Sequence, residues 1–178
     1  MDNGQTILID INIRADADDD GKEVPDVADD LRKRLKRNSA GRLYVDAFLL
    51  SHPDQDHIRG LREHFHLGPP SEWSKDDDNI FIREMWSSPI VFRRASPSLT
   101  LCEDAKAWAK EARRRVKRFR DDRFDTAEGD RTLIMSEDEN GKTNDILDIV
   151  VKLNETFFIR ITASRIRSAV RRPTSNFS

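Results

Sequence analysis

The segment that decides the fold is Leu43-Tyr44-Val45-Asp46-Ala47-Phe48-Leu49-Leu50, which leads directly into Ser51-His52-Pro53-Asp54-Gln55-Asp56-His57. The first eight residues are mostly apolar and end abruptly at polar residues. A bounded apolar run of this length is more typical of a buried strand than of a helix. We therefore predict a buried strand over residues 43–50 that is followed at once by a polar loop.

The polar loop carries the residue types that bind metals. His52, Asp54, Asp56 and His57 place two imidazoles and two carboxylates within six residues, and a loop that leaves a strand can curl so that these side chains converge. Imidazole and carboxylate ligands together suit zinc, manganese or iron. The alternative is an exposed polar turn with two incidental histidines, yet half of the four histidines lie here. Gly60 then allows the backbone to turn into a following helix.

The loop also resembles a known family. Phe48-Leu49-Leu50-Ser51-His52-Pro53-Asp54-Gln55-Asp56-His57-Ile58-Arg59-Gly60-Leu61 is similar to the metallo-β-lactamase superfamily signature His-x-His-x-Asp-His, in its His-x-Asp-x-Asp-His variant. This variant resembles the hydrolase domains attached to bacterial DNA-uptake competence proteins. The upstream Thr6-Ile7-Leu8-Ile9-Asp10 resembles the early strand of that superfamily, and the resemblance covers about residues 5–67.

The resemblance implies a metal-dependent hydrolase. By it, His52 and Asp54 would bind the first metal and Asp56 and His57 the second, with zinc as the expected ion and manganese or iron as alternatives. Asp56 would also orient the attacking water, which makes it the expected catalytic residue. The activated water would attack a phosphodiester, ester or amide of a substrate that the sequence does not identify. Asp54 replaces the more common histidine of the family and adds negative charge.

Only half of the family's ligand set is found in this sequence. Members have a further histidine, a bridging aspartate and a last histidine well after the motif, whereas no histidine here follows His66. We therefore expect residues 1–155 to form an incomplete metallo-β-lactamase-like domain, mainly the N-terminal half of an αββα sandwich. The alternative function is a catalytically inactive, truncated remnant or binding module of that fold. For His64 and His66 we expect a capping or surface role rather than metal binding.

Two basic regions suggest other partners. Residues 156–178 contain five arginines and none of the 33 acids. We interpret them as a basic tail that is foreign to the domain, with a nucleic-acid or partner-binding arm as the alternative. A long helix, capped by Ser98 or Thr100, has an Arg-rich polar side that offers a third function, nucleic-acid binding, against an ordinary solvated face. Its basic residues are Arg113, Arg114, Arg115, Lys117, Arg118, Arg120 and Arg123.

Other patterns place the motif in a layered α/β protein. We predict one strand over residues 6–14 with Ile7, Ile9, Ile11 and Ile13 facing the core, and a helix from Asp26 that ends at Gly41. The long helix has an apolar stripe at Leu101, Ala105, Trp108, Ala112, Val116 and Phe119. The remaining predicted elements are strands over residues 80–86 and 132–136 and a helix over residues 145–157.

Composition excludes several classes of protein. The net charge is −2 although 36% of residues are charged, so no global field attracts nucleic acid or membranes. Cys102 is the single cysteine, which excludes an internal disulfide. No apolar run approaches the roughly 20 residues that span a bilayer, and no signal peptide is visible. We expect a bacterial, cytoplasmic protein; its oligomeric state does not follow from the sequence.

Overall fold

The computed structural model describes residues 4–14, 26–88, 100–122 and 127–134. These ranges form a five-stranded sheet with the order β1-β4-β5-β6, in which β3 also pairs with β4. The β3–β4 pairing is antiparallel and the others are parallel. A mostly parallel sheet joined by helices confirms the α/β class. The strands are β1 (Ile7–Ile9), β3 (Lys36–Arg37), β4 (Leu43–Leu50), β5 (Phe81–Ser87) and β6 (Arg131–Ile134).

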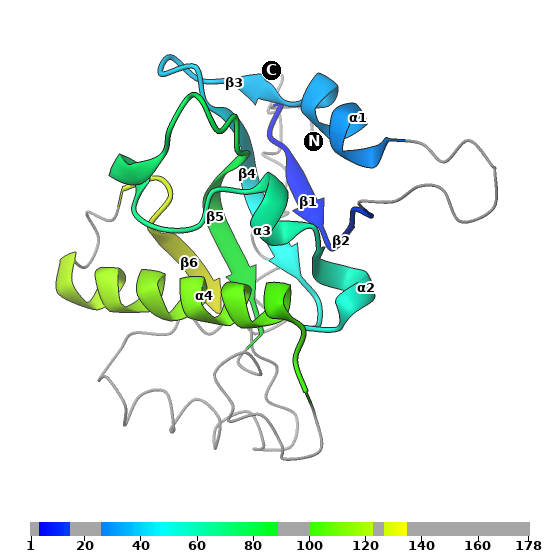
Figure 1. The fold of residues 1–178 in the computed structure, drawn as a ribbon. Helices are drawn as coiled ribbons and strands as arrows, with labels where there is room; N and C mark the ends of the chain where they lie inside the picture. The colour runs from blue at the N-terminus through cyan, green and yellow to red at the C-terminus, as the bar shows by residue number, and fades with distance from the viewer. Residues whose placement is uncertain (1–3, 15–25, 89–99, 123–126, 135–178) are drawn as a thin grey trace, which may run out of the picture.

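Strand β4 has the bounds that the apolar run predicted. Val45, Phe48 and Leu50 are fully buried, because β1 and β5 flank the strand and a helix covers it. That helix, α4 (Glu103–Asp122), crosses the near face of the sheet in Figure 1. Phe48 meets Trp108 of α4 edge-on, with ring centroids 4.8 Å apart. A strand enclosed in this way needs apolar residues at most positions, which explains the continuous run.

The predicted strand over residues 6–14 is interrupted. It divides into β1 and the two-residue β2 (Ile11–Asn12), with Asp10 between them in the left-handed conformation at φ 53°. Ile11 and Ile13 are buried, but Ile9 is 62% exposed, so the prediction that it faces the core was wrong. The alternation of the sequence continues through Asp10, whereas the backbone turns there and changes which side chains face inward.

The first helix is shorter than predicted. Helix α1 (Val27–Arg34) begins as expected after Asp26, whose carboxylate accepts a hydrogen bond from the amide of Asp29 at 2.9 Å. It ends at Arg34, so the prediction that Gly41 terminates it was wrong. Gly41 instead occupies the turn between β3 and β4 with φ 79°, and its amide donates to the carbonyl of Asn38. The glycine that was predicted to end the helix therefore lies in the connection between two strands.

The apolar stripe of α4 packs on the sheet as predicted at its described positions, and the side chain of Phe119 lies outside the described part of the structure. Ala105, Trp108, Ala112 and Val116 are buried, and the indole nitrogen of Trp108 donates a hydrogen bond of 3.1 Å to the hydroxyl of Ser87 at the end of β5. Leu101 is partly buried against the same core. The hydrogen bond satisfies a polar atom that the burial of Trp108 would otherwise leave without a partner.

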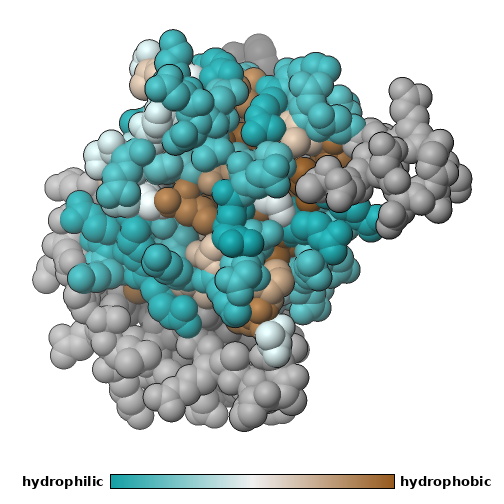
Figure 2. Space-filling view, viewed as in Figure 1, coloured by the Kyte–Doolittle hydropathy of each residue, from teal (hydrophilic) through white to brown (hydrophobic). Residues whose placement is uncertain are grey.

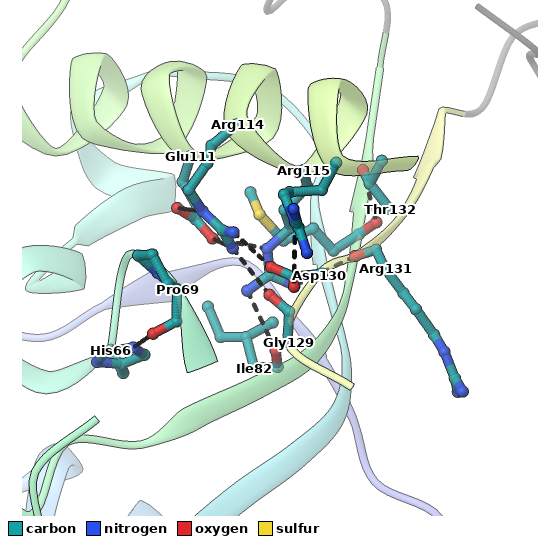
Figure 3. A network of polar contacts seen from close by, with 12 residues as sticks. His66, Pro69, Ile82, Glu111, Arg114, Arg115, Gly129, Asp130, Arg131 and Thr132 are labelled. Carbon is teal, nitrogen blue, oxygen red and sulfur yellow. Dashed lines mark hydrogen bonds and ion pairs between the residues drawn. The ribbon is translucent and has the colours of Figure 1, made fainter. Parts of the chain in front are cut away.

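A buried charged network fixes α4 to β5 and β6 (Figure 3). The Arg115 side chain is 1% exposed and donates to Glu111 at 2.7 Å, to the carbonyl of Ile82 at 3.1 Å and to the carbonyl of Arg131 at 3.2 Å. Arg114 forms further ion pairs with Glu111 and Asp130. One guanidinium thus satisfies backbone carbonyls of both strands and a carboxylate of its own helix.

Several predictions lie outside the described residues. These are the helix over residues 145–157, the end of the strand over residues 132–136 and the basic tail over residues 156–178. In the part of the chain that the structure describes, no helix is long and apolar enough to cross a membrane. Figure 2 shows a mainly hydrophilic near face, on which hydrophobic residues reach the surface in small, separate patches. Patches of this size are normal for a folded protein.

Replacing Arg115 tests the buried network. We expect Arg115→Ala to lower the free energy of unfolding by about 3–5 kcal/mol, because Glu111 and two strand carbonyls lose a buried partner. Urea denaturation measures the change. Lys117→Ala removes an exposed cation of the same helix and should change stability by less than about 0.5 kcal/mol. Equal effects of the two variants would contradict this role of Arg115.

Candidate metal site

The predicted metal-binding loop leaves the sheet at the carboxyl end of β4. His52 follows the strand by two residues, Asp54 precedes helix α2 (Gln55–Ile58), and Asp56 and His57 lie within that helix. Helix α3 (Leu61–His64) follows after Gly60. The structure therefore brings all four predicted ligands to one edge of the sheet, beside the carboxyl end of β1 (Figure 1). Ligand sites in open α/β sheets commonly lie at this edge.

Asp10 is the centre of the polar contacts in this loop. One carboxylate oxygen accepts a hydrogen bond of 2.8 Å from the amide of Ser51. The other is 2.6 Å from the Ser51 hydroxyl and 2.9 Å from Nδ1 of His57. The left-handed backbone of Asp10 turns its side chain toward the end of β4, so that these three contacts form together.

These contacts define the protonation of both histidine rings. The carboxylate of Asp10 accepts the Nδ1 proton of His57, so in the neutral form of that ring the lone pair lies on Nε2. The Ser51 hydroxyl donates its proton to Asp10, so its oxygen accepts from Nδ1 of His52 at 2.9 Å. Nε2 of His52 is then also free. This is the arrangement in which a histidine binds a metal while its second nitrogen is held by a neighbour.

The free nitrogens lie close to the two predicted carboxylate ligands. Nε2 of His52 is 3.6 Å from Asp54, and Nε2 of His57 is 3.5 Å from Asp56. The two imidazole rings are tilted against each other with centroids 3.6 Å apart. The Asp56 side chain is 71% exposed, and His57 is 29% exposed. The pairing of ligands by distance is therefore His52 with Asp54 and His57 with Asp56.

The electrostatics of the site favour a charged pair of Asp10 and His57. Partial burial acts to raise the pKa of Asp10, but hydrogen bonds from the side chain and amide of Ser51 and from His57 outweigh it and lower that pKa. The hydrogen bond to Asp10 raises the pKa of His57, and the negative charges of Asp56 and Asp54 act in the same direction. Protons therefore compete with metal for His57 at a higher pH than for an ordinary histidine.

The donor types fit zinc, but the side chains are not gathered around one point. Among the residues that the structure describes, no three His, Cys, Asp or Glu side chains form a group that could hold an ion. Asp54 and Asp56 are exposed and have room to change rotamer, whereas both histidines are held through Nδ1. The two imidazoles are accordingly the preorganised part of the site.

Gly60 has the role predicted for it. It adopts φ 91°, and a Cβ atom at this position would lie 2.8 Å from Cβ of Ile13 and 3.1 Å from its carbonyl oxygen. The amide of Ile13 also donates to the carbonyl of Arg59 at 3.0 Å. The end of the loop therefore packs directly against the chain that follows β2, where a larger residue has no space.

The two other histidines are held outside the loop. Nδ1 of His64 is 3.3 Å from the guanidinium of Arg32, and its side chain is 13% exposed. His66 contacts the carbonyl of Pro69 at 3.0 Å and stacks on Phe81. The structure thus places both histidines in partly buried packing contacts, whereas we expected a capping or surface role for them.

The Arg-rich side of α4 is less basic than the sequence suggested. Arg114 and Arg115 point from the helix toward the sheet and pair with Glu111 and Asp130 (Figure 3). The prediction that they belong to the solvated basic side was wrong. Arg113 and Lys117 are exposed as expected. A phosphate backbone would therefore meet fewer cations on α4 than the count of arginines implies.

A groove of about 640 Å³ lies away from the metal loop. It runs between α4 and residues 65–79, and Asn79 on its wall precedes the start of β5. Because β4 and β5 are parallel, this is the sheet edge opposite Ser51. The charged residues that line it are Arg62, Lys110 and Arg114 together with Glu72, Asp77 and Glu111, so its formal charges balance. The groove is not part of the candidate metal site.

Sequence reasoning missed the roles of Asp10 and Ser51. Asp10 was recognised only as part of an early strand, and Ser51 only as the start of the loop. The available signal was an acid directly after Ile7-Leu8-Ile9, in a strand parallel to one that ends in a histidine loop. To predict the role of Asp10 from this signal, one must know the register in which β1 pairs with β4, and that register is a property of the tertiary structure.

Comparisons with known proteins give no identification: no family model matches the chain, and neither a curated protein nor a solved structure is detectably similar to it.

Partial burial of His64 makes stability depend on pH. Burial lowers its pKa from the ordinary 6.5, and Arg32 acts in the same direction while Glu63 opposes it. The unfolded chain then binds the proton more readily than the folded chain. The contribution of neutral His64 to the free energy of unfolding is therefore fully present above pH 6.5 and is lost as the pH falls through the folded-state pKa. An NMR titration of His64 should give a midpoint below 6.5.

The matched variant is His64→Gln, in which this part of the pH dependence should vanish from urea denaturation curves. A His64 midpoint at or above the ordinary value would contradict the burial argument.

Proposed function

We propose that this chain is a metallohydrolase domain of the metallo-β-lactamase type that binds zinc through His52, Asp54, Asp56 and His57, with manganese or iron as alternative ions. The observation that carries the proposal is that both histidines are held through Nδ1 while both Nε2 atoms face carboxylates. An incidental polar turn needs no such arrangement. The mostly parallel sheet with its loop after β4 is compatible with an αββα sandwich.

Each residue of the loop has a separate task in this proposal. Asp10 holds His57 in the required tautomer, and Ser51 does the same for His52. Asp56, which is the more exposed carboxylate, accepts the proton of the attacking water and orients that water toward the substrate. A bound ion would supply Lewis-acid activation. The proposed substrate class is a phosphodiester or another ester or amide.

Zinc titration tests the proposal. Isothermal titration calorimetry of the wild-type chain with zinc chloride at neutral pH should show saturable binding, and His52→Ala combined with His57→Ala should abolish it. Binding should weaken as the pH falls, because His57 takes up a proton at a higher pH than an ordinary histidine. His66→Gln removes an imidazole outside the loop and should leave the affinity unchanged.

The outcomes separate the enzyme from its alternative. Zinc binding together with zinc-dependent hydrolysis of an activated phosphodiester or ester supports the hydrolase. Binding without hydrolysis supports a non-catalytic binding module of the same fold, to which the lack of any histidine after His66 in the sequence also points. Absence of zinc binding overturns the hydrolase and supports a catalytically inactive remnant, whereas zinc binding that survives the double replacement overturns the assignment of the ligands.

A further inference from the structure

Asp104 of α4 connects that helix to the end of the metal loop. Its side chain is 15% exposed. One carboxylate oxygen accepts a hydrogen bond of 3.0 Å from the amide of Gly60. The other accepts from the amide of Arg62 at 3.2 Å and from Nε of the same arginine at 2.8 Å. Asp104, which is 44 positions from Gly60 in the sequence, thus accepts hydrogen bonds from two backbone amides and from one charged side chain.

The amides of Gly60 and Arg62 lie where their own segment supplies no side-chain cap. They belong to the beginning of α3, where the N-cap residue is Gly60 and no local side chain caps the helix. The first amides of any helix lack partners within it, and a carboxylate is a strong acceptor for them. Asp104 therefore fixes the position of the backbone where the loop joins α3.

The metal loop is consequently held by a carboxylate at each end. Asp10 holds its start through Ser51, and Asp104 holds its end through Gly60. Helix α2 lies between these two points, and His57 precedes Gly60 by three residues. Because Gly60 also packs against Ile13, its backbone has little freedom to move away from this position. A shift at Gly60 would rotate α2 and with it the two ligands that α2 carries.

We propose that Asp104 is a positioning residue of the candidate metal site: by accepting the amides of Gly60 and Arg62 it sets the orientation of α2 and therefore of His57. This inference rests on the proposed function as far as metal affinity is concerned. The Arg62 ion pair is the exposed part of the contact, and the backbone amides carry the positioning effect.

Three variants separate the contributions. Asp104→Asn places an amide NH₂ opposite N–H donors, so one backbone contact is lost, and we expect zinc affinity to fall by about 10- to 100-fold. Arg62→Gln removes the ion pair but leaves both amide contacts, and Glu103→Gln removes a neighbouring exposed carboxylate of the same helix turn. Both should bind zinc as the wild type does, in calorimetry of the full-length chain.

A second readout works without any metal. The Nδ1 proton of His57, held by Asp10, should give a downfield NMR resonance in the wild type that is retained in Glu103→Gln and is shifted or broadened in Asp104→Asn. If the wild-type chain fails to bind zinc, the proposed function is wrong, whereas this resonance still decides the role of Asp104. An unchanged resonance together with unchanged affinity in Asp104→Asn would overturn the inference, as would an equal loss in Arg62→Gln.

Hydrogen exchange of the wild type removes the dependence on a stable variant. The amides of Gly60 and Arg62 should exchange much more slowly than free amides. A separate measurement uses cobalt bound in place of zinc, which should give different absorption spectra in the wild type and in Asp104→Asn. Unprotected amides would contradict the contact itself. An identical cobalt spectrum would contradict its effect on the ligands.

Discussion

The parallel pairing of β1 with β4 places Asp10 beside Ser51, and the candidate site depends on this register. Ile7 lies opposite Ala47 and Ile9 opposite Leu49, so both strands end at the same edge of the sheet. A slip by one residue would reverse the faces of β1 and carry the carboxylate away from the loop. Leu8 of β1 packs against the core, and a slip that turned it outward would expose its apolar side chain. Core packing thereby determines the chemistry of the surface loop.

The site combines one rigid part with one adjustable part. The imidazoles are held by Asp10 and Ser51, whereas the carboxylates of Asp54 and Asp56 project into solvent. Because the pKa of Asp10 is lowered and the pKa of His57 is raised, Asp10 is ionised at the pH values at which His57 titrates. The charge that orients His57 is therefore permanent, while the charge on His57 itself depends on pH.

The parts of this protein that were predictable have local causes. The eight-residue strand β4 and the apolar stripe of α4 follow from periodicity, and the ligand types follow from the spacing of the loop. The break at Asp10 was not predictable, because alternation continues through it and only tertiary hydrogen bonds favour the left-handed turn. Arg115 looked like a surface residue for a similar reason: its partners include the carbonyls of Ile82 and Arg131, which are far away in sequence. Asp104 resembled an ordinary acid of a first helical turn.

The same guanidinium of Arg115 also defines how short the folded unit can be. It bonds at once to its own helix, to β5 and to β6, and its charge is buried with them. A version of the chain that stopped after α4 would remove the carbonyl of Arg131, which accepts from Arg115, and the carboxylate of Asp130, which pairs with Arg114. Helix α4, β5 and β6 therefore form one cooperative unit, and a domain chosen for expression has to include the described residues through Ile134.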